Sequence, residues 1–132
     1  MITRKQIDVS ARDTFVINSI QSAGVSDRVV GIVPVKSKLV KVYEAHGVAS
    51  GATCTLSIER LQGVETSGTG DQVVAATINL NGAANTVQEG TIVTTSAIDV
   101  FAAGDRIGTN VTGTVGSLAT MVVCLQFRPI DD

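Results

Sequence analysis

Short segments of alternating apolar and polar residues restrict the fold of this chain more than any other feature. Within Ala52–Arg60, positions 52, 54, 56 and 58 hold Ala, Cys, Leu and Ile, whereas positions 53, 55, 57 and 59 hold Thr, Thr, Ser and Glu. A period of two predicts a β-strand with one face buried and the other in water. Similar segments recur between Gly, Asn and Ser residues, and no stretch of ten residues keeps a helical period. We therefore expect an all-β protein.

The segments follow one another at the short spacing that is typical of antiparallel sheets. Strands are predicted over Thr14–Ile20, Arg28–Val35, Lys38–Val48, Ala52–Leu61, Gln72–Leu80, Thr86–Thr95, Ile98–Phe101, Arg106–Val111 and Leu118–Phe127. A Gly- and Thr-rich stretch at 63–71 and the dipeptide Asn81-Gly82 indicate a loop and a turn. Because strands do not alternate with helices, the pattern favours an antiparallel sandwich or barrel over an α/β fold.

The length of 132 residues suits one domain, and hydrophobic residues make up 44% of it. Aromatic residues are only 3% and Trp is absent, so the core is expected to consist of Val, Ile, Leu and Ala. We assign residues 28–132 to the sandwich. Residues 1–27 mix charged and apolar side chains, which leaves two interpretations open. They form an extended N-terminal arm that orders against a neighbour, or they supply the first strand of the same domain.

The predicted terminal strand, Leu118–Phe127, is apolar on both faces. Alternate residues from 119 to 127 are Ala, Met, Val, Leu and Phe, and the other face holds Leu118, Val122 and Cys124. A two-layer sandwich has no third layer to cover an outer apolar face, so such a face is expected in a subunit interface. We therefore predict an oligomer with Leu118, Val122 and Cys124 in its interface.

Residues capable of catalysis are sparse. His46 is the only histidine, and no serine elbow or cysteine lies near it in sequence to assemble a triad. Zinc sites use three or four Cys and His ligands, and Cys54, Cys124 and His46 lack ligand spacing. The remaining candidates are carboxylates that fall at predicted strand ends or in turns, where solvated acids belong: Glu59, Glu65, Asp71, Glu89, Asp99 and Asp105. We predict no enzymatic activity, no catalytic residue, no metal site and no cofactor.

Charge and composition also exclude several kinds of partner. The formal net charge is −2, so no basic excess favours binding to nucleic acid. No segment approaches the ~18 continuous apolar residues that span a membrane, and the N-terminus lacks the apolar region of a secretory signal. Synthesis in a reducing cytoplasm is expected. Cys54 and Cys124 are then interpreted as buried core residues, and a disulfide between them is possible only if their strands are neighbours.

Several strings of residues resemble small virion proteins of tailed bacteriophages, in particular jelly-roll capsid decoration (cement) proteins. These strings are Leu39–Val48, Gly51–Glu59, Ala84–Thr91, Phe101–Ile107, Val111–Thr114 and the last apolar strand. The resemblance covers residues 30–128 and implies an antiparallel, jelly-roll β-sandwich that decorates and stabilises the phage head as a homotrimer.

The resemblance also implies a partner and a location. The partner would be the major capsid protein, and the location the outer surface of the virion after synthesis in the host cytoplasm. The N-terminal arm would contact the capsid through Ile2, Arg4, Lys5, Ile7, Val9 and Arg12. An alternative is a carbohydrate- or receptor-binding jelly-roll module of a phage tail fibre, because jelly rolls host both functions. A cupin-type enzyme would need a cluster of His and Glu ligands, and the single histidine argues against it.

Overall fold

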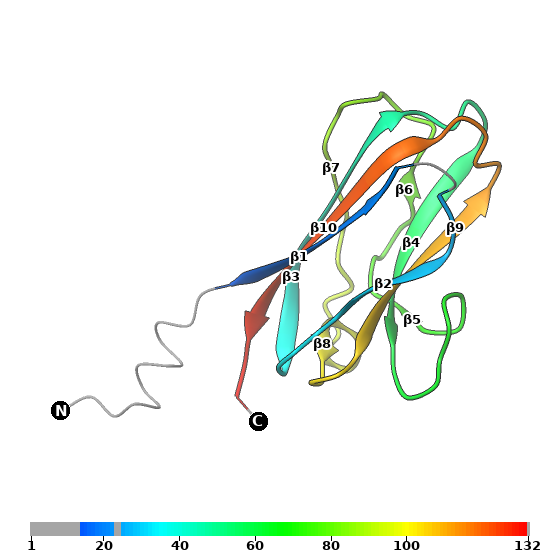
Figure 1. Ribbon diagram of the computed structural model, residues 1–132. Coiled ribbons are helices and arrows are strands. Elements are labelled where there is room, and N and C mark those ends of the chain that lie inside the picture. Colours follow the sequence, from blue (N-terminus) through cyan, green and yellow to red (C-terminus); the bar gives the residue numbers. More distant parts are fainter. Residues whose placement is uncertain (1–13, 23–24, 132) are drawn as a thin grey trace.

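The computed structural model describes residues 14–22 and 25–131, and almost all regular structure in them is antiparallel β (Figure 1). The elements are β1 (Phe15–Gln21), β2 (Arg28–Ile32), β3 (Ser37–Val48), β4 (Cys54–Leu61), β5 (Asp71–Gln72), β6 (Ile78–Asn79), β7 (Gln88–Glu89), α2 (Ser96–Asp99), β8 (Val100–Phe101), β9 (Arg106–Gly113) and β10 (Ala119–Pro129). The expected all-β class is therefore confirmed. Six predicted strands are present with similar bounds. They are Thr14–Ile20, Arg28–Val35, Lys38–Val48, Ala52–Leu61, Arg106–Val111 and Leu118–Phe127.

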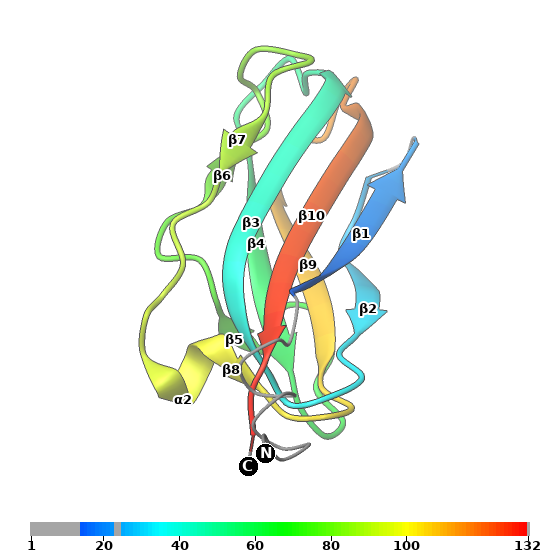
Figure 2. The ribbon, with the colours of Figure 1, turned by 90° about the vertical axis from the view of Figure 1, so that its left-hand side faces the viewer.

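Two sheets face each other and form a sandwich (Figures 1 and 2). The first sheet has the strand order β1-β10-β3-β7, with β8 also paired to β3, and the second has the order β2-β9-β4-β5, with β6 also paired to β4. The first strand of the chain therefore pairs with the last, and β2 pairs with β9. This nested pairing, in which a long hairpin wraps around itself, is the jelly-roll arrangement. The predicted jelly-roll β-sandwich is confirmed.

The core between the sheets is mainly aliphatic, as the composition indicates. Its fully buried members include Leu39, Leu56, Ile58, Leu80, Ile107 and Leu125. At one end, Phe127 stacks on Phe15 at a ring-centroid distance of 5.4 Å and meets Phe101 edge-on at 5.2 Å. These rings come from β1, β8 and β10, so the aromatic cluster links the first and last strands of the chain to β8, which lies beyond β3 in the same sheet.

The strands predicted between residues 72 and 101 are much shorter in the structure. The segment Gln72–Leu80 makes only two-residue pairings at each end, as β5 and β6, and Thr86–Thr95 contributes only β7 and a single bridge between Ile92 and Val74. The start of Ile98–Phe101 lies in the single helical turn α2. These segments run along the side of the sandwich opposite β1 and β2, where a partner strand exists for only part of their length (Figure 2).

Strand β4 differs from the prediction of one wet face. Both Ser57 and Glu59, which occupy the polar face in sequence, are buried. The loop after β4 folds back over this face, and the Gly68 N–H donates a hydrogen bond of 2.6 Å to the Glu59 carboxylate. Glu59 is therefore not the solvated carboxylate that was expected. The alternation correctly predicted a strand, but the exposure of its second face depended on a distant loop.

Leu118 also differs from its expected position. It lies in the core of its own domain, so it is not on the outer face together with Val122 and Cys124. The reason is local backbone geometry. Strand β10 begins only at Ala119, and Thr120 has a φ of 56°, which breaks the strict alternation of side-chain direction. Residues on either side of Thr120 therefore do not share the face that a regular strand would give them.

The described part of the N-terminal region, residues 14–22, belongs to the sandwich. Strand β1 pairs with β10 along its whole length, from Phe15 opposite Phe127 to Gln21 opposite Met121. This part is the first strand of the sandwich sheet. The predicted contact residues of the arm, Ile2, Arg4, Lys5, Ile7, Val9 and Arg12, lie outside the described residues.

Candidate assembly surface and buried polar clusters

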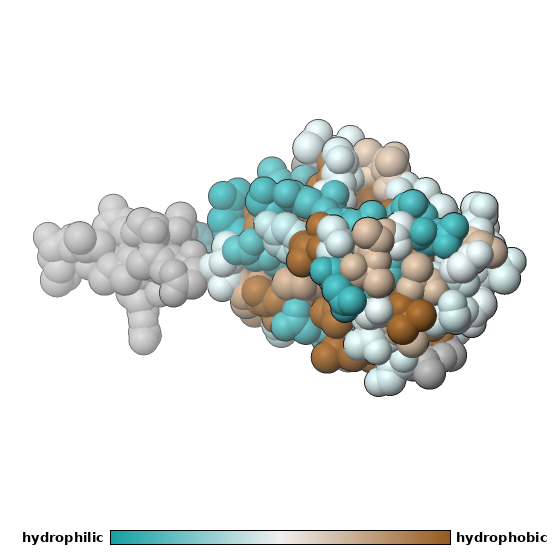
Figure 3. All heavy atoms as spheres, turned by 90° about the horizontal axis from the view of Figure 1, so that it is seen from above, coloured by the Kyte–Doolittle hydropathy of each residue, from teal (hydrophilic) through white to brown (hydrophobic). Residues whose placement is uncertain are grey.

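The clearest candidate for a functional surface is the side of the sandwich formed by β1 and β2, which we term the apolar edge. In the described residues, each of these strands pairs with a neighbour on one side only. Val16 and Ile20 on β1 are 50% and 65% exposed, and Val29 and Ile32 on β2 are 48% and 64% exposed. Strands β1 and β2 lie at the right of Figure 2. The same side of the molecule is the lower rim in Figure 3, where hydrophobic (brown) side chains gather.

Free strand edges with apolar side chains are normally protected, because they can pair with other chains. Strand β1 carries neither a proline nor a charged residue, whereas β2 begins with the exposed Arg28 and has an irregular register between Val29 and Gly31. The two strands also meet each other, since Gly31 of β2 lies against Ile17 of β1. The sandwich is therefore closed internally at this side while its outer rim stays apolar.

The apolar edge continues onto the outer face of the first sheet. Cross-strand pairing places Ile20 beside Val122 and Val122 beside Ala45. One row further along, Cys124 lies between Asn18 and Tyr43. Val122 and Cys124 are half-buried by these neighbours, so two of the three predicted interface residues do lie on the outer face. Sequence reasoning missed Val16, Ile20, Val29 and Ile32, whose exposure depends on β1 and β2 being edge strands.

A polar boundary limits this outer face on its far side. Lys41 on β3 and Glu89 on β7 form an exposed ion pair with an N–O distance of 2.9 Å. The hydrogen bond and charge of Glu89 raise the pKa of Lys41. Exposed pairs of this kind add little to stability, so the pair matters mainly as a hydrophilic border.

A buried polar cluster lies inside the end of the sandwich at which β3 ends, which is the upper end in Figure 1. Glu44 and His46 on β3 both face inward, and their side chains are 0% exposed. The His46 Nδ1 lies 2.9 and 3.2 Å from the two Glu44 carboxylate oxygens, and its Nε2 lies 3.2 Å from the Gly82 carbonyl oxygen. Gln88 donates a hydrogen bond of 2.8 Å to Glu44. His46 is thus a buried residue in a hydrogen-bonded polar network.

A second polar cluster lies at the lower end. Arg60 donates to the Val100 carbonyl and to Asp71, each at 2.7 Å. Asp99 is almost fully buried, with Lys38 Nζ 3.8 Å from one carboxylate oxygen. The other oxygen of Asp99 has no hydrogen-bond partner among the described residues. Asp99 was expected to be solvated, and its burial follows from its place in α2, at the start of β8.

Arg106 and the neighbouring turn connect β8 and β9 to the loop that follows β4. In the turn, Gly104 has a φ of 90° and Asp105 accepts a hydrogen bond from the Ala102 N–H. Arg106 donates a hydrogen bond of 2.8 Å to the Gly63 carbonyl. It therefore anchors the loop that folds over β4.

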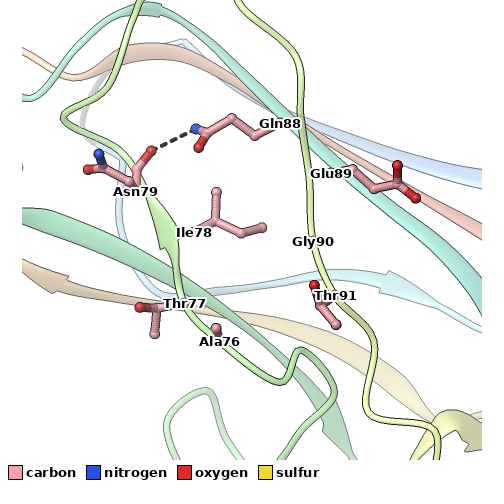
Figure 4. Close-up of a pocket in the computed structure, with 8 residues that line it drawn as sticks. All are labelled: Ala76, Thr77, Ile78, Asn79, Gln88, Glu89, Gly90 and Thr91. Carbon is pink, nitrogen blue, oxygen red and sulfur yellow. Dashed lines mark hydrogen bonds between the residues drawn. The ribbon is translucent and has the colours of Figure 1, made fainter.

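A groove of about 250 Å³ lies on the side opposite the apolar edge, at the seam between the two sheets (Figure 4). Residues 76–79 form one wall and residues 88–91 the other. Gln88 reaches across and donates a hydrogen bond of 2.7 Å to the Asn79 carbonyl. The groove wall thus shares Gln88 with the buried Glu44–His46 cluster.

The described residues contain no group of three or more His, Cys, Asp and Glu side chains placed to hold a metal ion. Cys54 and Cys124 are free thiols on strands of different sheets, so the condition for a disulfide is not met. Burial raises the pKa of the Cys54 thiol. No helix within these residues is long and apolar enough to cross a membrane.

The strand order and the open apolar edge define a jelly-roll β-sandwich protein with a candidate assembly surface. The fold is similar to that of a chain in a solved structure described as the capsid of Ralstonia phage GP4. The TM-score is 0.60 at 12% sequence identity, over 92% of this chain and 86% of that chain. No protein-family model matches the sequence. No curated protein matches it either. At this identity the comparison shows a shared fold.

Proposed function

We propose that this protein is a non-enzymatic structural component of a phage virion, namely a decoration or cement protein on the outer surface of the head. The observation that carries the proposal is the jelly-roll fold, which is similar over nearly the whole chain to a phage capsid chain. The resemblance of residues 30–128 to decoration proteins supports the same role. The partner would be the major capsid protein.

The apolar edge supports an assembly role on physical grounds. The side chains of Val16, Ile20, Val29 and Ile32 are 48–65% exposed in the isolated chain. Burying apolar surface contributes about 25 cal/mol per Å², so leaving this edge in water forgoes stabilisation that a partner could supply. Among the described residues β1 pairs with β10 only, so its other edge is available for β-augmentation. A protein that holds capsid subunits together needs such a surface and needs no catalytic group.

We further propose that the protein acts as a homotrimer. The apolar edge and the seam groove lie on opposite sides of the sandwich, and two different surfaces of this kind suit head-to-tail contacts that close into a ring. A trimer would place three weak capsid contacts in one particle, so that binding gains from multivalency. Light scattering on the purified protein is expected to give the mass of three protomers. A clean monomer at micromolar concentration would contradict the trimer.

The capsid contact is tested by co-sedimentation of the protein with phage heads that lack their decoration protein. The full chain is expected to pellet with the heads. A chain that begins at residue 14 keeps β1, so it should stay folded and oligomeric but lose most of the binding if residues 1–13 grip the capsid. Equal binding of the truncated chain would contradict a role of the arm. Failure of the full chain to bind any head would contradict the decoration role.

The alternative remains a carbohydrate- or receptor-binding module of a tail fibre. Tyr43, on the outer face of the first sheet, is the single tyrosine available for stacking on a sugar. A glycan array distinguishes the two proposals. Strong, specific hits that are lost in Tyr43→Ala would favour the receptor-binding module over the decoration protein.

A further inference from the structure

His46 and Glu44 lie beneath residues 80–87, the segment that joins β6 to β7 and that we term the strap. Most of the strap is exposed, including Val87 at 68%. Two hydrogen bonds fasten its middle to β3, and among the described residues both are made by His46. The Nε2 of His46 faces the Gly82 carbonyl, and its backbone carbonyl accepts a hydrogen bond of 2.7 Å from the Asn85 N–H. The attachment of the middle of the strap to β3 therefore depends on one residue, whereas its first residue, Leu80, is held by Cys54 and Ser50.

The surroundings of the imidazole require a particular protonation state. Its Nδ1 faces the Glu44 carboxylate and its Nε2 faces a carbonyl oxygen, and both of these groups can only accept a hydrogen bond. A neutral histidine carries one N–H and could satisfy one of them, whereas an imidazolium donates to both. Because the site is buried, a neutral ring would also leave the Glu44 carboxylate without its counter-charge.

We propose that His46, Glu44 and the strap form a proton-dependent clamp, in which the imidazolium of His46 ties the Gly82 carbonyl to the Glu44 carboxylate. Loss of one proton keeps the stronger hydrogen bond from Nδ1 to Glu44 and breaks the one from Nε2 to Gly82. The strap is then held only by its ends and by the Asn85 N–H. The clamp is independent of the proposed role in a virion.

The charges around the ring agree with this geometry. Burial by itself lowers the pKa of His46, but the hydrogen bond to Glu44, the hydrogen bond to the Gly82 carbonyl and the charge of Glu44 raise it, and the net pKa is raised. The other residues that hydrogen bonding and strand pairing place at this pair are uncharged. Gln88 on β7 donates to Glu44, and Met121 is the residue paired with His46 on β10.

The single histidine allows a direct test on the full, unmodified chain. Two-dimensional NMR follows the Cε1–H signal of His46 while the pH is raised from about 5 to 9, and amide exchange of Asn85 is measured over the same range. The expected midpoint lies above the ordinary value of 6.5. The protection factor of the Asn85 amide, corrected for the intrinsic rise of exchange with pH, should fall in parallel, while that of the core amide of Val123 should not.

Two variants test whether the Glu44 carboxylate, and not burial alone, determines the titration midpoint of His46 and the protection of the Asn85 amide. Glu44→Gln should move the His46 midpoint below 6.5 and loosen the Asn85 amide already at neutral pH, because the counter-charge is gone. Glu89→Gln, which removes an exposed carboxylate from the adjacent position on β7, should leave the midpoint unchanged. A wild-type midpoint at or below 6.5, or a titration that leaves the Asn85 protection unchanged, would overturn the proposal even if Glu44→Gln did not fold.

Discussion

Gly31 of β2 lies directly against Ile17 of β1, so that a Cβ atom built on Gly31 would fall 2.7 Å from the Cγ2 of Ile17. The two strands belong to different sheets, and this close approach is where the sandwich closes beneath the apolar edge. A side chain on Gly31 would push the sheets apart at this point, because the Ile17 methyl group is attached next to the backbone and has little freedom to move.

The Gly31→Ala variant is therefore expected to lose about 1–3 kcal/mol of unfolding free energy, the usual cost of overpacking. Urea unfolding followed by circular dichroism measures this loss. Gly82→Ala is a suitable control, since its Cβ would meet the Asn79 side chain at an ordinary 3.4 Å. Equal stability of Gly31→Ala and the wild type would mean that the sheets can separate at the edge without cost.

The aromatic cluster predicts a larger effect at Phe127. This ring is fully buried, stacks on Phe15 and meets Phe101 edge-on. Phe127→Ala should cost about 3–5 kcal/mol, whereas Phe127→Leu, which keeps most of the volume, should cost clearly less. Thermal unfolding of the two variants provides the comparison. Similar costs for both would indicate that the ring contacts themselves supply most of the stability.

The apolar edge predicts a separation between stability and assembly. Ile20→Lys replaces an exposed side chain, so the unfolding free energy should change by no more than about 0.5 kcal/mol. A lysine on an edge strand opposes pairing with another chain, so the variant should associate far more weakly in light scattering. The control is Val64→Lys, at a loop position that is 97% exposed and away from the edge. If both variants associate alike, the apolar edge is not the interface.

The two cysteines predict unequal labelling by a thiol reagent. Cys54 is buried and its pKa is raised by that burial, so it should react only when the protein unfolds. Cys124 is half-buried on the outer face of the first sheet and should react in the folded chain. Mass spectrometry after labelling at neutral pH identifies the modified residue. In an oligomer that covers this face, the labelling of Cys124 should slow; an unchanged rate would place the interface elsewhere.

The raised pKa of His46 also predicts how stability depends on pH. The folded state binds this proton more tightly than the unfolded chain does, so the contribution of His46 is complete below the unfolded pKa near 6.5. It is lost as the pH rises through the folded pKa. Each unit by which that pKa is raised corresponds to ~1.4 kcal/mol. Urea unfolding at a series of pH values should show this loss in the wild type but not in His46→Gln, and matching slopes would contradict it.

Strands in the middle of the sheets could be predicted from the sequence because they pair along most of their length. Lys38–Val48, Arg106–Val111 and Leu118–Phe127 correspond closely to β3, β9 and β10. The prediction failed for Gln72–Leu80 and Thr86–Thr95, whose alternation is genuine but whose partners extend over only two residues. Pairing length is a property of the whole sheet, and local alternation carries no information about it.

The candidate site was predictable only in part. Val122 and Cys124 were expected on an outer face and lie there, whereas one residue with positive φ, Thr120, separates Leu118 from them. The apolar edge was not predicted, because alternation cannot reveal which strands lie at a border. The burial of Glu44 and Asp99 could not be predicted either, since a carboxylate in an alternating pattern is expected to face solvent until its partners are known.

By itself, the sequence determined that this protein is all-β, that its core is aliphatic, and approximately where its fully paired strands lie, because side-chain direction and hydrophobicity are local properties of the chain. Only the tertiary structure decided the nested jelly-roll order, the open edge at Val16 and Ile20, and the burial of His46 against Glu44. Those features arise from contacts between residues far apart in the chain. Whether a side chain is exposed, paired or charged depends on what the distant segments place beside it.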